Sequence, residues 1–182
     1  DCGVVALLGL RGAGKSSLGR ELALRLGVPF VEQDALVEEA AGMERGEVFT
    51  LHGEDYYRDL ARRTLDRLLA EGEQPMVLAT TGNVVADPES LELLERRAST
   101  VWLKASGEDH WQRVLAQGDV RPMNDRPDAR AELERLLERR EPLYARARHT
   151  VDTSALGREG ALQRLVELVA AGENLPWTED PE

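Results

Sequence analysis

A glycine-rich segment near the start of the chain constrains the fold more than any other feature. Residues 9–16 read GLRGAGKS and match the phosphate-binding pattern G-x-x-x-x-G-K-[ST]. The apolar run at residues 4–8 precedes this segment without polar alternation, as in a parallel strand covered on both faces. Apolar residues then recur at helical spacing, at Leu18, Leu22 and Leu26. The sequence therefore predicts a strand, a phosphate-binding loop and a helix in direct succession.

The chemistry of this loop favours a nucleotide-like ligand over a glycine-rich turn that binds nothing. Its glycines let backbone N–H groups turn toward phosphate oxygens, and the following helix adds the partial positive charge of its N-terminus. Lys15 has the right position to reach β and γ phosphates, and the Ser16 hydroxyl to bind Mg²⁺. The predicted phosphate contacts are Gly9, Gly12, Ala13, Gly14, Lys15, Ser16 and Ser17.

Strand-like and helix-like segments alternate along the rest of the chain. Short strands are expected at residues 4–8, 29–31, 76–79, 100–103 and 150–152. Helical patterns are expected at residues 15–26, 34–40, 48–51, 55–70, 89–97, 108–117, 129–140, 142–148 and 158–171. This alternation predicts an α/β P-loop NTPase fold with a central, parallel, five-stranded sheet flanked by helices.

Composition limits the partners and the setting. Asp and Glu outnumber Lys and Arg by 34 to 23, and the net charge of -11 would repel a nucleic-acid backbone. No apolar run approaches the ~18 residues that cross a membrane. Cys2 is the single cysteine and no secretory leader is recognisable, so we expect no disulfides and a cytoplasmic protein. We expect one domain at residues 1–171 and a polar tail at residues 172–182.

Three further residues are ambiguous when read alone. Asp34 opens a helical segment, where it fits a helix N-cap as well as it fits a general base. Arg58 shares a helical segment with other arginines, which is typical of a solvated surface charge. Arg121 lies in a segment rich in Pro, Asp and Arg, at residues 118–128, that we expect to form a flap. A cation on a flap can reach a phosphoryl group in transfer, or can simply keep a loop soluble.

Several short motifs add to the glycine-rich loop between the first strand and about Ser154. They are Asp34, Gly53-Glu54, Tyr57-Arg58, Ala79-Thr80 with Gly82, Arg121-Pro122 and the pattern Arg140-x-Pro142-x-Tyr144. In these residues the chain resembles the shikimate kinases. The resemblance implies ATP and Mg²⁺, with Asp34 as the catalytic base and with Lys15 and Arg121 on the phosphates. It also implies that Arg58, Gly82 and Arg140 contact the substrate.

The chain departs from the pattern of these kinases at two places. The resemblance places an Asp-x-Asp pair where this chain has Glu32-Gln33-Asp34, so the acid that helps to order Mg²⁺ is longer by a methylene. We expect Ser16 and Glu32 as metal ligands, with changed geometry. The triple glycine of the kinases is replaced by Thr81-Gly82-Asn83, which puts side chains where bare backbone should approach the substrate. The shikimate pocket is therefore expected to be altered.

Residues 101–106 (VWLKAS) and 116–123 (AQGDVRPM) carry a second resemblance. They are similar to the shikimate-kinase-like C-terminal domains of the benzoyl-CoA-responsive regulators of bacterial benzoate degradation. That resemblance implies an upstream helix-turn-helix domain that contacts DNA, which fits a chain that begins at Asp1 without Met. Our first hypothesis is therefore an effector-binding domain for benzoyl-CoA or a related CoA thioester in a transcriptional regulator.

Two alternatives belong to other classes of protein. One is an ATP- and Mg²⁺-dependent small-molecule kinase, of the shikimate kinase type, that transfers a phosphoryl group to a hydroxyl. The other is a scaffold that binds a nucleotide and no second ligand. The sequence leaves the oligomeric state open, and a homodimer is one option.

Overall fold

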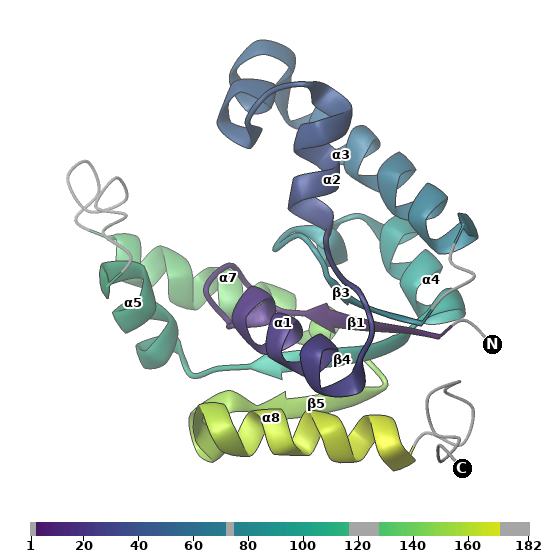
Figure 1. The fold of residues 1–182 in the computed structure, drawn as a ribbon. Helices are drawn as coiled ribbons and strands as arrows, with labels where there is room; N and C mark the ends of the chain where they lie inside the picture. Colours follow the sequence, from purple (N-terminus) through teal and green to yellow (C-terminus); the bar gives the residue numbers. More distant parts are fainter. Residues whose placement is uncertain (1–2, 72–74, 117–127, 172–182) are drawn as a thin grey trace.

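A single parallel sheet organises the computed structural model, which describes residues 3–71, 75–116 and 128–171. Its five strands stand in the order β2-β3-β1-β4-β5 (Figure 1). The strands are β1 (Val4–Leu8), β2 (Phe30–Glu32), β3 (Met76–Ala79), β4 (Ser99–Lys104) and β5 (His149–Asp152). Every neighbouring pair is parallel. The predicted α/β fold with a five-stranded parallel sheet is confirmed.

Helices cover both faces of this sheet, as parallel strands require. They are α1 (Lys15–Leu26), α2 (Gln33–Ala41), α3 (Arg45–Glu71), the short 3-10 helix η1 (Val84–Ala86), α4 (Pro88–Arg97), α5 (Gly107–Ala116), α7 (Ala129–Tyr144) and α8 (Thr153–Ala171). Among the residues that the structure describes, no helix combines the length and the apolar character needed to cross a bilayer.

The central strand β1 feeds two apolar cores. Val4, Ala6 and Leu8 point into a core shared with α3, α4 and α7. Val5 and Leu7 point into a core shared with α1 and α8 on the other face. All five side chains are at most 1% exposed. The unbroken apolar run thus reflects burial on two faces at once.

The order of the strands decides which loops meet. Because the strands are parallel, their carboxyl ends lie at one edge of the sheet. At this edge the glycine-rich loop follows β1, residues 80–83 follow β3, and α2 follows β2. A third apolar cluster, which includes Val37 and Tyr57, packs α2 against α3. These two helices form a lobe that rises beside the loops (Figure 1).

Two helices differ from the sequence prediction. We predicted separate helices on each side of Glu141, but α7 continues through Pro142 to Tyr144. Proline fixes φ near the helical value, so its cost here is one backbone hydrogen bond near the end of the helix. The predicted stretches at residues 48–51 and 55–70 belong to α3, which is broken at Gly53.

Other predicted features cannot be placed in the fold. The predicted flap, apart from Asp128, and the predicted tail at residues 172–182 lie outside the described residues. Arg121 lies outside them as well.

Candidate active site

The glycine-rich loop joins β1 to α1 in a conformation that only glycine adopts readily. Gly14 has φ 96° and stands directly before the first residue of α1. It carries no side chain to cap the helix, and the first N–H groups of an α-helix have no intrahelical partner. A tight turn, in which the Ala13 N–H donates to the Leu10 carbonyl over 3.0 Å, brings the loop back over the helix. The loop therefore offers backbone donors to an anion.

Lys15 is a buried cation at the start of this helix. Its side chain is folded onto the loop, where the ammonium donates to the Gly9 carbonyl. Burial is the main cause that lowers the pKa of Lys15 to about 8, against the attraction of Asp34. The nearby charges of Arg45 and Arg140 contribute to this lowering. Removal from water costs a buried ammonium free energy, and a phosphate bound beside Lys15 would offset that cost.

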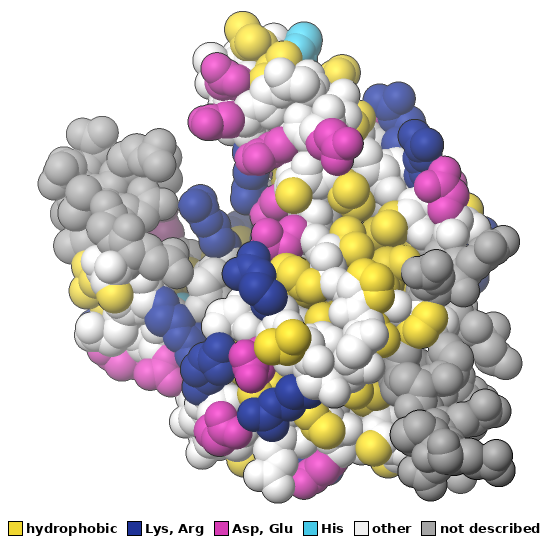
Figure 2. All heavy atoms as spheres, in the orientation of Figure 1, with side chains coloured by type: hydrophobic (Ala, Val, Ile, Leu, Met, Phe, Trp, Pro, Cys, Tyr) yellow, Lys and Arg dark blue, Asp and Glu magenta, His cyan; other side chains and the backbone are white. Residues whose placement is uncertain are grey.

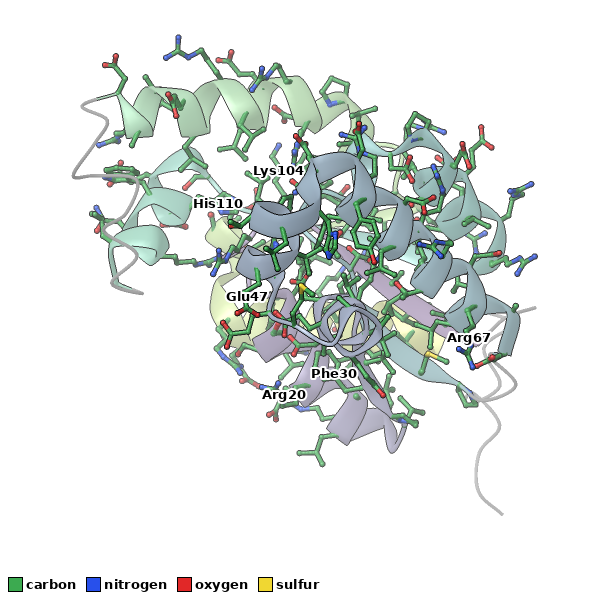
Figure 3. All side chains as sticks on the ribbon, turned by 90° about the horizontal axis from the view of Figure 1, so that it is seen from above. Arg20, Phe30, Glu47, Arg67, Lys104 and His110 are labelled. Atoms are coloured by element: carbon green, nitrogen blue, oxygen red, sulfur yellow. The ribbon has the colours of Figure 1, made fainter. Side chains whose placement is uncertain are left out.

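The two predicted metal ligands lie side by side. The Ser16 hydroxyl donates to a carboxylate oxygen of Glu32, which comes from the end of β2. Arg20, one turn along α1, approaches the other oxygen of Glu32 at 3.8 Å and lies over the Phe30 ring at 5.3 Å (Figure 3). The longer Glu32 side chain therefore still reaches the loop.

A cavity of about 480 Å³ opens over the loop and gathers cationic side chains. The cations that line it are Arg11, Lys15, Arg45, Arg113 and Arg158, and the acids are Glu32 and Asp34. Figure 2 shows Lys and Arg side chains along the hollow beside the α2–α3 lobe. An excess of positive charge in a chain of net charge -11 fits a polyphosphate ligand.

Of these cations sequence reasoning assigned Lys15 and missed Arg11, Arg45, Arg113 and Arg158. Arg113 of α5 donates to the Gly12 carbonyl over 3.0 Å, and Arg158 of α8 donates to the Ser17 hydroxyl over 2.9 Å. Each lies in the helix that follows a strand, β4 or β5, so each starts from the edge of the sheet that carries the loop. That position after a strand was the signal that could have found them.

Asp34 lies in the same cavity as Lys15 and does not cap its helix. The N-cap residue of α2 is Glu32, and Asp34 sits in the first turn. The N-cap interpretation is wrong because α2 begins earlier, at Gln33, whose buried amide bonds to the Ala61 carbonyl and to the Thr81 N–H. One carboxylate oxygen of Asp34 accepts from the Tyr57 hydroxyl over 3.2 Å. The side chain remains 45% exposed and so is accessible to a ligand.

Arg140 and Arg58 lie in the wall of a second, adjoining cavity. Arg140 donates to the Gly82 carbonyl over 2.8 Å and to the Asn83 side-chain oxygen over 2.9 Å. The Tyr144 hydroxyl donates to the same Gly82 carbonyl over 3.1 Å. Arg58 is half-exposed and approaches Glu54 at 3.4 Å. Two guanidinium groups thus flank this cavity, one fixed by the loop after β3 and one less constrained.

Comparison with known proteins decides the family. A model of the shikimate kinase family matches residues 11–170. The chain belongs to the shikimate kinase family. The shikimate kinase of Nitrobacter winogradskyi is 46% identical over 147 residues, which cover 81% of this chain and 67% of that protein. The shikimate kinase of Ruegeria pomeroyi is 40% identical over 167 residues, which cover 92% and 83%.

Solved structures of shikimate kinases share the fold. Shikimate kinase from Acinetobacter baumannii, in complex with shikimate, superimposes with a TM-score of 0.83 at 28% identity. The match covers 94% of each chain. Shikimate kinase from Bacteroides thetaiotaomicron gives a TM-score of 0.80 at 27% identity, over 91% of this chain and 97% of that one.

These findings overturn our first hypothesis, the CoA-thioester sensor of a transcriptional regulator. The curated relatives at 36–46% identity are shikimate kinases, and they match most of the chain. The hypothesis rested on the second resemblance, at residues 101–106 and 116–123, and on the side chains of Thr81 and Asn83. Asn83 is bonded to Arg140 in the cavity wall, so its side chain helps to hold a cation there. The departure from triple glycine is therefore no reason to exclude an acid as the second ligand.

Proposed function

We propose that this chain is a shikimate kinase, which transfers the γ-phosphoryl group of ATP to a hydroxyl of shikimate. The observation that carries this proposal is that Lys15 and Asp34 line one cavity. The Lys15 ammonium can bind phosphates, and the Asp34 carboxylate can accept the proton of a hydroxyl. Both groups therefore face the same cavity. Phosphoryl transfer depends chiefly on such positioning and on charge stabilisation.

The loop between β1 and α1 would hold the phosphates of ATP. The proposed contacts are the backbone of Gly9, Gly12, Ala13 and Gly14, the Lys15 ammonium and the first turn of α1 at Ser16 and Ser17. Ordered donors around a shared anion stabilise the charge that moves onto the leaving ADP. The Lys15 ammonium would leave the Gly9 carbonyl and turn to the β and γ phosphates.

Ser16 and Glu32 would hold Mg²⁺ beside the phosphates. A hydroxyl and a carboxylate are hard oxygen ligands, the kind that Mg²⁺ prefers, and they already touch each other here. Within the described residues no cluster of three or more His, Cys, Asp or Glu side chains forms a metal cage. That suits an ion that keeps waters and takes phosphate oxygens as ligands. When bound, Mg²⁺ would neutralise charge on the β and γ phosphate oxygens.

On the acceptor side, Asp34 would act as the general base. It would take the proton of the acceptor hydroxyl as that oxygen attacks the γ phosphorus and the bond to ADP breaks. The Tyr57 hydroxyl, bonded to Asp34 over 3.2 Å, would fix the direction of the carboxylate. Arg58 and Arg140, in the second cavity, would hold the carboxylate of shikimate. Gly82, which lines the cavity over the loop, would also contact the substrate. Arg121 remains a prediction from the resemblance, as a further cation on the phosphoryl group.

Shikimate-dependent formation of ADP from ATP and Mg²⁺ tests the proposal. We expect turnover by the wild-type chain, and we expect Asp34→Asn to lower kcat by about 10²- to 10⁴-fold because the amide cannot accept the proton. Glu39→Gln, an exposed acid on the same helix, is the matched control and should retain wild-type kcat. Absence of shikimate-dependent turnover in the wild-type chain would refute the function, and full activity in Asp34→Asn would refute the base.

A further inference from the structure

Arg45 lies where the phosphate side and the acceptor side of the cavity meet, and neither the resemblance nor the sequence gave it a function. Its side chain is 27% exposed and lines the cavity together with Lys15 and Asp34. The nearest carboxylate oxygen, on Asp34, is 3.9 Å from the guanidinium. That separation is longer than a hydrogen bond. The ion pair is therefore loose.

Aromatic rings hold the guanidinium in this position. It lies over the Phe49 ring at 5.7 Å and over the Tyr57 ring at 5.5 Å, and the two rings stack on each other at 4.5 Å. A ring face attracts a guanidinium without using its N–H groups. Within the described part of the chain, the Arg45 guanidinium donates no hydrogen bond. Its donors can therefore serve a ligand in the cavity.

The break in α3 makes this arrangement. Phe49 and Tyr57 stand eight residues apart in sequence, which in a continuous helix is about 12 Å along the axis. They stack because Gly53 leaves the helical conformation, with φ 84° and ψ 174°. The same break carries Arg45 back over Tyr57. The position of Arg45 is therefore set by the backbone of α3.

Arg45 and Lys15 are two cations of one cavity, and Asp34 is the acid that interacts with both. The positive charge of Arg45 contributes to the lowered pKa of Lys15, because the two cations repel each other. Asp34 alone offsets them in part, from a carboxylate that is also bonded to Tyr57. A multiply charged anion between loop and lobe would relieve this repulsion.

We propose that Arg45 is a catalytic residue that donates to the γ-phosphoryl group of ATP from the acceptor side, opposite Lys15. The inference rests on the proposed kinase function and adds a contact to it. In the transfer, the bond from the γ phosphorus to ADP breaks, the bond to the acceptor oxygen forms, and the acceptor proton goes to Asp34. Arg45 stays protonated and stabilises the charge on the oxygens of the phosphoryl group.

Steady-state kinetics of Arg45→Met and Arg45→Lys test this role. Methionine keeps a long apolar side chain on the two rings but removes the charge. We expect Arg45→Met to lower kcat by about 100-fold and to leave the KM for shikimate within about threefold, because the contact is to the phosphoryl group. Arg45→Lys should recover at least about tenfold of that loss.

Arg67→Met is the matched control, on the same helix. Arg67 lies at the other end of α3, 79% exposed and paired with Glu71 at 2.8 Å (Figure 3). Its substitution should leave kcat and both KM values unchanged. An increase in the KM for shikimate at unchanged kcat in Arg45→Met would overturn the proposal, since Arg45 would then bind the acceptor.

A binding measurement separates this inference from the proposed function. Calorimetry compares the non-hydrolysable analogue AMPPNP with ADP, each with Mg²⁺ and without an acceptor. We expect Arg45→Met to weaken AMPPNP binding by about tenfold and ADP binding by less than about twofold, because only AMPPNP presents a γ group.

If Arg45→Met loses the same factor in affinity for AMPPNP as for ADP, relative to the wild-type chain, the role of Arg45 is overturned. If the wild-type chain does not phosphorylate shikimate, the proposed function is refuted. The comparison of AMPPNP with ADP would still show whether Arg45 contacts the γ-phosphoryl group. If Arg45→Met does not fold, Arg45→Gln, which also removes the charge, supplies the same comparison.

Discussion

His110 on α5 is a buried imidazole among charges. It is 3% exposed, and within the described residues its Nδ1 atom has no hydrogen-bond partner. Burial, with the positive charges of Arg113 and Lys15 and against the attraction of Asp109, lowers the pKa of His110 to about 4. The folded protein therefore holds this imidazole neutral.

This lowered pKa makes stability depend on pH. Between the unfolded value of 6.5 and the folded value of about 4, the unfolded chain binds the proton more readily. The contribution of His110 is complete above the unfolded pKa and is lost as the pH falls toward the folded pKa. From pH 7 to pH 5 we expect the free energy of unfolding of the wild-type chain to fall by about 2 kcal/mol more than that of His110→Asn, measured by urea denaturation. His110→Gln should follow His110→Asn, and parallel curves for all three proteins would contradict the prediction.

Among the elements, α3 depends on its break at Gly53. The backbone there has φ 84° and ψ 174°, a conformation that is costly for any residue with a Cβ atom. A Cβ at this position would meet no atom within 4 Å. The requirement for glycine is therefore one of backbone conformation and not of space.

Replacing this glycine should destabilise the protein and disturb the lobe. We expect Gly53→Ala to lower the free energy of unfolding by about 1–3 kcal/mol in urea denaturation. Because the break also brings Arg45 over Tyr57, kcat should fall in the same variant. Gly46→Ala is the matched control: it lies in the same helix without a positive φ and has equally open surroundings. It should be neutral or stabilising by up to about 1 kcal/mol, and equal losses in both variants would refute the argument.

At the scale of the whole molecule, charge is divided between an acidic chain and a cationic cavity. The net charge is -11, whereas five cations and two acids line the cavity over the loop. A localised positive field can attract an anion even when the surrounding surface repels it. Affinity for a polyphosphate should therefore have a large electrostatic part.

Salt titration checks this division of charge. Raising NaCl from about 50 mM to about 500 mM should weaken the binding of ATP with Mg²⁺ by roughly tenfold, measured by calorimetry, because the ions screen the cavity. Adenosine, which has no phosphates, is the control ligand and should lose less than about twofold. The same salt dependence for both ligands would mean that charge in the cavity does not drive binding.

The sequence by itself determined the strand, loop and helix around Lys15 and, through the alternation of strands and helices, the α/β class. These features depend on local rules: the glycines that a tight turn needs, and an apolar run that a strand buried on two faces needs. Such rules act over a few residues and can be read without knowing what lies across the sheet. The resemblance to the shikimate kinases implied Ser16 and Glu32 as metal ligands, and the structure brings these two side chains into contact.

Only the tertiary structure decided how the other side chains of the site combine. Asp34 could be read as a cap or a base until the start of α2 at Gln33 was known. Arg140 and Asn83 stand 57 positions apart, and their bond depends on how α7 packs beside the loop after β3. Arg45 needed the break at Gly53 to reach the cavity. Side chains meet across elements because of strand order and helix packing, which no local pattern in the sequence encodes.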